Sequence, residues 1–386
     1  MTKTQGKLKK LLGHLLSIGI GLAVGWVAGY FIGSCMDAVT ARFPDMNLIT
    51  ALALLVLIVV LAFFLQLIIH EAGHLVFGLL SGYHFSSFRI GSFLWLKEDG
   101  KLRCKRLKVT GTGGQCLMSP PDPVDGKFPV VLYNLGGAII NVLTSVLFLL
   151  LYFLSRPLPL LAMFFMSMAV MGLATALING IPLHTPTIDN DGYNALSLRK
   201  DPDAAAAFRM QMKVNELISK GQRLKDMPEE WFALPSDEKM KNSMVAATAV
   251  FACNRLMDQH RFAEADALME KYLSMDTAIV GLHRSLMICD RIYLELIGEN
   301  RRGTIASMLD KNQKQFMRSM KKFPSVIRTE YVYALLHEQS AEKAEKIAKA
   351  FEACARTYPY PSDIQSEREL LEIADAVHKE QGHDGI

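Results

Sequence analysis

Hydrophobic residues gather into four long runs in the first half of the chain, at residues 11–33, 48–80, 130–155 and 158–181. Each run reaches or exceeds the ~20 residues that an α-helix needs to cross the apolar part of a bilayer. In the second run, Gln66 is the only polar side chain larger than threonine before the chain reaches His70. The pattern therefore predicts a mainly α-helical, polytopic membrane protein with about four transmembrane helices.

The first run has two interpretations, a cleaved signal peptide or a retained span. It follows four lysines, but it is long for a signal peptide and no clear cleavage site follows it, which favours a span. The loop 81–129 holds eight basic residues, whereas the loop 34–47 and the turn at 156 hold one each. Because basic loops stay in the cytoplasm, both termini are expected there.

The polar loop 81–129 is predicted to contain β-structure. Phe88–Lys97 and Lys101–Thr110 flank Glu98-Asp99-Gly100, whose Asp-Gly pair is typical of a hairpin turn. Gln115–Met118 is a candidate for one more short strand. We therefore expect a small, membrane-associated β-hairpin region.

Charge rises after residue 200, and amphipathic helical patterns replace the apolar runs. Three segments, Asp258–Leu273, Gly298–Gln313 and His337–Glu352, start about 40 residues apart, as tetratricopeptide-like helix-pair repeats do. A plain helical bundle is the alternative. The predicted organisation is a transmembrane domain at 1–192, connecting helices at 193–235 and a cytoplasmic helical domain at 236–386, with a break at Leu224–Pro235.

Composition narrows the class of protein further. The formal net charge is only +4 and 51% of the residues are hydrophobic, so no strong attraction to nucleic acid is expected and the lipid bilayer is the main environment. None of the six cysteines forms a CxxC pair. A disulfide framework and a cysteine zinc site are therefore both disfavoured.

The end of the second run carries His70-Glu71-Ala72-Gly73-His74, an HExxH motif. Residues four apart lie on one face of a helix, so both imidazoles can reach one metal ion. Neutral imidazole suits Zn²⁺, and Glu71 is placed to act as the general base. A chance match is the alternative, but three ionisable residues at the end of an apolar span are costly and usually functional.

A third ligand must come from elsewhere in the chain. After the fourth run, the segment from Asn179 to Gly192 contains Pro182 and Pro186, where the helix should break, and ends in Asp191-Gly192. Together with HExxH and the glycine-rich segment Gly136–Asn141, this order of motifs resembles the site-2 protease family of intramembrane zinc metalloproteases. The likeness covers residues 48–192.

The resemblance implies that His70, His74 and Asp191 bind one Zn²⁺ and that Glu71 is catalytic. Asn141 and Asn179 would line or support the site. The gap from Pro182 to Asp191 is longer than is usual in the family, which makes Asp189 a competitor for the third position. His184 is a further possible ligand, or simply a histidine at a span end.

The strand region also has a counterpart in the family, where it is thought to hold substrate as an added strand. Gly113 and Gly114 would then help to bind substrate, and a hairpin lying on lipid headgroups is the alternative. His84 is expected to be a loop residue.

The resemblance implies cleavage of a membrane-embedded substrate: a membrane-tethered regulator, an anti-sigma factor or a signal-peptide remnant, in a bacterial cell membrane. The main alternative is a non-enzymatic membrane scaffold that binds a cytosolic partner through its C-terminal helical domain. A zinc protease acting on soluble peptides at the cytoplasmic face is a third possibility.

Overall fold

The architecture is that of a computed structural model, which describes residues 3–98, 100–107, 113–183 and 189–383, without the side chains of residues 3–18, 20, 23–24, 98 and 382–383. The chain divides into two compact units. The first comprises residues 1–77, 132–183 and 190–193, and the second comprises 78–131, 184–189 and 194–386. Each unit is described by itself.

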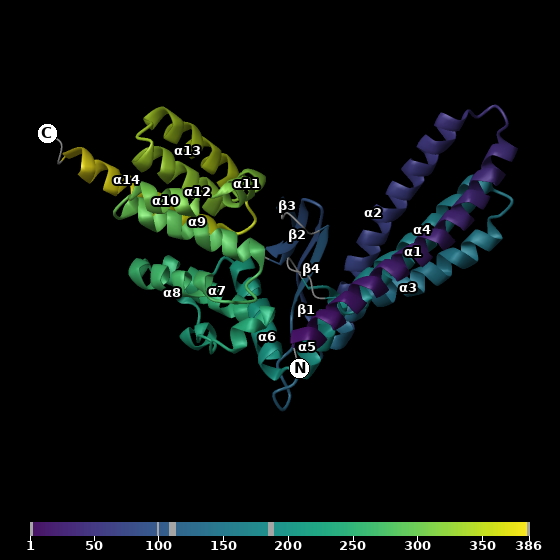
Figure 1. Cartoon of the computed structure of the whole chain (residues 1–386), viewed down its shortest axis with the longest axis horizontal. Helices are drawn as coiled ribbons and strands as arrows, with labels where there is room; N and C mark the ends of the chain where they lie inside the picture. The colour runs from purple at the N-terminus through teal and green to yellow at the C-terminus, as the bar shows by residue number, and fades with distance from the viewer. Residues whose placement is uncertain (1–2, 99, 108–112, 184–188, 384–386) are drawn as a thin grey trace. The chain divides into compact units, whose positions relative to one another are not determined.

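The first unit is built from four long helices, α1 (Lys3–Arg42), α2 (Leu48–Leu80), α3 (Val131–Leu154) and α4 (Pro159–Gly180), with the end of α2 belonging to the second unit (Figure 1). Among the described residues, three helices are long and apolar enough to cross a membrane: α2, α3 and α4. They coincide with the second, third and fourth predicted spans. Helix α1 covers the predicted first span, which stays a prediction.

Large hydrophobic side chains remain exposed along α2 and α3, for example Val56, Leu57 and Leu147. Such a surface is suited to lipid rather than to water. Inside the unit, Cys35 and Val39 of α1 pack with Met163 of α4 in an apolar cluster. The outer faces of these helices are thus hydrophobic, and the buried interior of the unit is small and formed by contacts between helices.

Helices α2 and α3 approach each other through glycine. A Cβ atom added at Gly73 would lie 2.4 Å from the carbonyl oxygen of Gly136, and one added at Gly136 would lie 2.6 Å from the carbonyl oxygen of Gly73. Small residues at helix crossings permit this closeness in membrane proteins. Gly73 lies between the two histidines of HExxH, so the crossing brings α3 directly against the motif.

The second unit contains a four-stranded antiparallel sheet in the order β3-β2-β1-β4. Its strands are β1 (His84–Ile90), β2 (Phe93–Glu98), β3 (Lys101–Arg106) and β4 (Gly114–Ser119). The predicted hairpin is present as β2 and β3, and the predicted short strand is present as β4. Asp99 of the predicted turn lies outside the described residues.

The predicted first arm of the hairpin, Phe88–Lys97, was too long. Gly91 has a φ of 57°, which is unfavourable for residues with a side chain, and the chain turns there. The arm is therefore divided between β1 and β2, and His84 is the first residue of β1 rather than a loop residue. The hairpin region is a sheet with two more strands than the hairpin itself.

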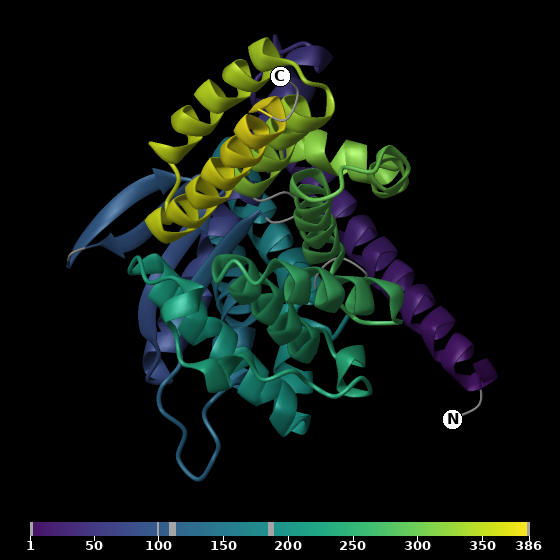
Figure 2. The same ribbon diagram turned by 90° about the vertical axis from the view of Figure 1, so that its left-hand side faces the viewer.

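Helices make up most of the rest of the second unit, and from α6 to α9 each helix packs against the next along the chain (Figures 1 and 2). They are α5 (Asp191–Lys200, shared with the first unit), α6 (Pro202–Ser219), α7 (Ser243–Asp258), α8 (Phe262–Ser274), α9 (Gly281–Ile297), α10 (Arg302–Met308), α11 (Lys311–Ser319), α12 (Pro324–Val332), the π-helical turn η4 (Tyr333–His337), α13 (Ala341–Ala355) and α14 (Pro361–His383). The short 3₁₀ turns are η1 (Leu224–Asp226), η2 (Glu229–Phe232) and η3 (Lys239–Lys241).

Local sequence explains several of these helix starts. The side chains of Asp201, Asn242, Asp310 and Ser340 accept hydrogen bonds from backbone N–H groups in the first turns of α6, α7, α11 and α13. Such caps satisfy donors that a helix leaves free. The three segments proposed as repeats fall on α8, on α10 with α11, and on α13. Their tetratricopeptide-like character stays a prediction.

Candidate metal centre

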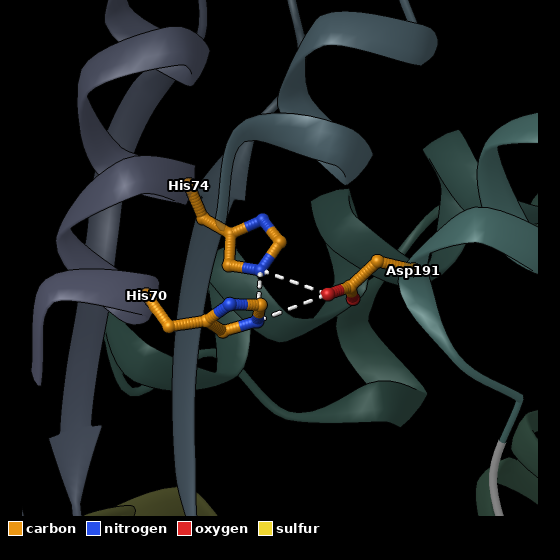
Figure 3. Close-up of side chains that lie close together, drawn as sticks. All are labelled: His70, His74 and Asp191. Carbon is orange, nitrogen blue, oxygen red and sulfur yellow. Dashed lines mark hydrogen bonds and ion pairs between the residues drawn. The ribbon is translucent and has the colours of Figure 1, made fainter. Parts of the chain in front are cut away.

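Two histidines and one aspartate converge in the first unit (Figure 3). His70 and His74 lie one turn apart on α2, and both are buried. Asp191 is the first residue of α5. Its Oδ2 atom lies 3.0 Å from Nε2 of His70 and 3.3 Å from Nε2 of His74, and the two Nε2 atoms are 3.2 Å apart.

These separations fit a zinc site. Zn–N and Zn–O bonds of about 2.0–2.1 Å in a tetrahedron place neighbouring ligand atoms roughly 3.3 Å apart. The three measured separations, 3.0, 3.2 and 3.3 Å, are close to that value. Two imidazoles and one carboxylate also form the type of donor set that catalytic zinc sites use, with the fourth position left open. No other such group of three is found among the described residues.

The remaining ring nitrogens fix the tautomer of each histidine. Nδ1 of His74 lies 2.8 Å from the carbonyl oxygen of Tyr133, which can only accept, so Nδ1 carries the proton. Nδ1 of His70 lies 2.7 Å from Oδ1 of Asn141. In the neutral form, each ring therefore keeps its lone pair on Nε2, which is the form that metal ligation requires.

Asn141 is itself held in one orientation by Gln66. Its side-chain amide donates to the carbonyl oxygen of Gln66 at 3.2 Å and to Oε1 of Gln66 at 2.7 Å, which leaves Oδ1 for His70. Gln66 in turn donates to the carbonyl oxygen of Met168 at 2.8 Å. Both amide side chains are completely buried. A chain of hydrogen bonds thus joins α4 to His70 through α2 and α3.

Gly137 of α3 packs directly against the His70 ring. A Cβ atom added there would lie 2.5 Å from Cε1 of His70 and 2.6 Å from Nε2. These distances are far below van der Waals contact, so only glycine leaves space for the ring. The predicted motif Gly136–Asn141 therefore contributes a helix crossing, a ring support and a hydrogen-bond acceptor.

Asn190 positions Asp191 at the start of α5. Its side-chain amide donates to the carbonyl oxygens of Ile178 and Ile181 at 2.7 and 2.6 Å, and its Oδ1 accepts from the backbone N–H groups of Leu183 and Tyr193 at 2.9 and 3.0 Å. One side chain therefore ties the end of α4 to the start of α5.

The charge state of Asp191 suits metal binding. Burial acts to raise the pKa of its carboxyl, but His70 and His74, which donate hydrogen bonds to it and carry charge when they are protonated, lower the pKa further than burial raises it. The resulting pKa is about 2. The side chain is therefore a carboxylate near neutral pH, the form that binds a cation.

The other predicted residues lie as follows. Glu71 is buried next to His70 on α2. Asn179 donates to the carbonyl oxygen of Thr175 in its own helix at 3.0 Å. Asp189, the competitor, accepts a hydrogen bond from the Ser243 hydroxyl at 2.6 Å in the second unit.

Gly114 is the first residue of β4, and Gly113 directly precedes the strand; its carbonyl oxygen accepts from the N–H of Gly91 at 2.8 Å. His184 lies outside the described residues.

Sequence reasoning assigned no role to Gln66, Tyr133 and Asn190. Gln66 was recognisable in the sequence, because it is the one polar side chain larger than threonine in its run before His70 and lies one helical turn from that residue. The carbonyl of Tyr133 was not recognisable, since any residue there offers one.

Helices that are long and apolar enough to span a membrane, together with a His-His-Asp cluster whose histidines come from an HExxH motif, are typical of membrane metalloproteases. The family model of peptidase family M50 matches residues 55–353, and the chain belongs to this family. It is the site-2 protease family, whose members are zinc metalloproteases of membranes, so the resemblance noted from the motifs is confirmed. Searches of curated proteins and of solved structures find no match.

Proposed function

We propose that this protein is an intramembrane zinc endopeptidase that uses His70, His74 and Asp191 as metal ligands and Glu71 as general base. The observation that carries the proposal is the convergence of two Nε2 atoms and one carboxylate oxygen within 3.3 Å of one another. Membership of peptidase family M50 supports it. The substrate is a peptide bond of a membrane-embedded segment, in a regulator, an anti-sigma factor or a signal-peptide remnant.

The residues divide the chemistry between them. Zinc at this site would act as a Lewis acid and lower the pKa of a water toward neutrality. Glu71 takes the proton of the attacking water and later passes it to the leaving amine. Asn141 and Tyr133 keep both histidines in the ligating tautomer, and Gln66 keeps Asn141 in place.

Substrate binding is assigned to an edge of the sheet. Cleavage requires an extended backbone, and a free edge can hold one as an added strand. Among the described strands, β3 and β4 form the two edges. β4 packs with α6, where the Ser119 hydroxyl donates to the Glu216 carboxylate, and Gly113 and Gly114 lie at the start of β4.

Both termini are proposed to lie in the cytoplasm.

The first experiment measures zinc in purified protein, comparing the wild type with His74→Ala, Asp191→Ala and Asp189→Ala. We expect about one zinc per chain in the wild type, retained in Asp189→Ala and lost in the other two variants. Asp189 is the matched control because it accepts from Ser243 instead of facing the histidines. Zinc lost from Asp189→Ala but kept in Asp191→Ala would reverse the assignment.

The second experiment separates catalysis from metal binding. Glu71→Gln preserves shape but removes the base, so zinc content should stay near that of the wild type while cleavage of a co-expressed membrane substrate falls by about 10²-fold or more. Intact cleavage by Glu71→Gln would refute the proposed mechanism. A wild type without zinc after zinc re-addition would instead support a membrane scaffold that acts through its helical domain.

A further inference from the structure

A groove of about 550 Å³ lies in the helical part of the second unit. Helices α9, α11, α12 and α13 and the turn η4 contribute its walls. Its floor is apolar, and Ile292, Met317 and Ile327 on the floor are buried. The groove therefore opens onto the hydrophobic core of the domain.

The rim of the groove is strongly basic. Five positively charged residues lie along it, against one acidic residue, Glu330, and all five are exposed: Lys314, Arg318, Lys321, Lys343 and Lys346. Only Lys343 is neutralised by an ion pair in the part of the chain that the structure describes, with Glu338 at 2.6 Å. The whole chain has a net charge of only +4, so this rim is a local concentration of positive charge.

We propose that this groove binds an acidic amphipathic helix of a protein partner. Apolar side chains spaced along one face of a helix would enter the groove, and acidic side chains flanking them would meet the rim. Charge complementarity selects the partner, because the other four basic residues of the rim form no ion pair among the described residues and outnumber Glu330. The proposal goes beyond the proteolytic function and does not depend on it.

The shape of the groove argues against a bilayer as the occupant. Membrane-surface elements present apolar side chains outward, whereas Ile292 and Ile327 are at most 3% exposed. Nucleic acid is also a poor fit, because stacking of bases needs exposed aromatic rings and Tyr333 is the only aromatic side chain of the lining. A long-chain fatty acid shares the apolar and anionic chemistry and is tested below.

The experiment uses the full-length protein in nanodiscs of zwitterionic phosphatidylcholine and a fluorescent peptide of ~15 residues, long enough to form a helix. The peptide has leucine at positions i, i+3, i+4 and i+7 and glutamate at most others. One control peptide has the same composition with leucine on all faces, and another has lysine in place of glutamate. Binding is followed by fluorescence anisotropy.

Two variants change the groove and one matched variant does not. Lys314→Glu/Arg318→Glu/Lys346→Glu reverses the rim, and Ala350→Trp fills the groove from an exposed lining position. Lys311→Glu/Lys322→Glu introduces negative charge on exposed positions at and just after α11 that do not line the groove. Circular dichroism of each variant checks that the helices are retained.

We expect both groove variants to weaken binding of the acidic amphipathic peptide by about tenfold or more, and the matched variant by less than about threefold. Both control peptides should bind at least about tenfold more weakly than the test peptide. Equal weakening by the matched variant, or equal binding of the scrambled peptide, would overturn the proposal. So would saturable binding of oleate that displaces the peptide at equal molar concentration and is abolished by Ala350→Trp.

Discussion

Replacing Gly137 by alanine should disable the metal centre while leaving the helices in place. The new Cβ atom would lie 2.5 Å from Cε1 of His70 and 2.7 Å from Nδ1. Carbon atoms in contact are about 3.5 Å apart or more, so the ring must retreat by about 1 Å. Helix α3 cannot retreat in its place without opening the crossing at Gly73 and Gly136, which maintains its contact with α2.

A displacement of this size is large for a metal ligand. Zinc–ligand distances in working sites vary by about 0.2 Å, and mutations of groups that orient a metal ligand cost about 10- to 10²-fold in metal affinity, or roughly 1.4–2.7 kcal/mol. Alanine is also a better helix former than glycine by up to about 1 kcal/mol, so α3 itself should not unfold. We therefore expect zinc affinity to fall about 10²-fold in Gly137→Ala.

The assay is competition with a zinc-binding chelator dye, using detergent-purified protein, with helix content checked by circular dichroism. Gly29→Ala is the matched control, because it is the same substitution in a long helix and a Cβ atom there meets nothing within 4 Å. If Gly137→Ala bound zinc as tightly as Gly29→Ala, His70 would not be a ligand in the orientation described here.

Two further predictions concern the support of the site and the helical domain. Gln66→Leu should lower zinc affinity by about tenfold, because it removes the Oε1 atom that accepts from Asn141 and orients it. Gln66→Glu keeps an acceptor there and should restore much of the affinity. Equal zinc affinities of Gln66→Leu and the wild type in the chelator assay would contradict this prediction. Burial and the Asp258 carboxylate raise the pKa of Asp363 to about 7. Between about pH 4 and pH 7 the folded protein therefore keeps a proton on Asp363 that the unfolded chain has lost. Because the folded state binds more protons in this range, the free energy of unfolding falls as the pH rises toward 7. Asp363→Asn should therefore stabilise α14 by about 2–3 kcal/mol more at pH 8 than at pH 5, measured by hydrogen-exchange protection in the full-length protein, and an equal gain at both values would refute the cause.

The parts of the fold that the sequence predicted are those set by local spacing. Hydropathy alone predicted α2, α3 and α4, and the spacing of His70 and His74 on one helix face predicted two neighbouring side chains. Gly91 shows the limit of this approach, since its positive φ value divides one expected strand into two, and nothing in the alternation of side chains indicates where a turn falls.

The support of the site could not be predicted because its contacts are distant in the chain. Asn141 is 71 residues from His70, and Gln66 reaches a carbonyl 102 residues away. A backbone carbonyl such as that of Tyr133 has no sequence signal at all. The basic groove is a similar case, because its walls come from four helices whose packing only the structure gives.

The position of Asp191 depends on how a backbone hydrogen bond that α4 loses at Pro182 is replaced. In a continuing helix the carbonyl oxygen of Ile178 would accept from residue 182, but Pro182 has no N–H to donate, and α4 ends at Gly180. The side chain of Asn190 supplies the missing donor at 2.7 Å, and the neighbouring residue in the chain is Asp191. Irregular backbone within a membrane domain must satisfy its polar groups inside the protein. Asn190, which replaces the lost hydrogen bond, therefore also fixes the position of the Asp191 carboxylate beside His70 and His74. The stability of the backbone at the end of α4 and the geometry of the site depend on the same contacts.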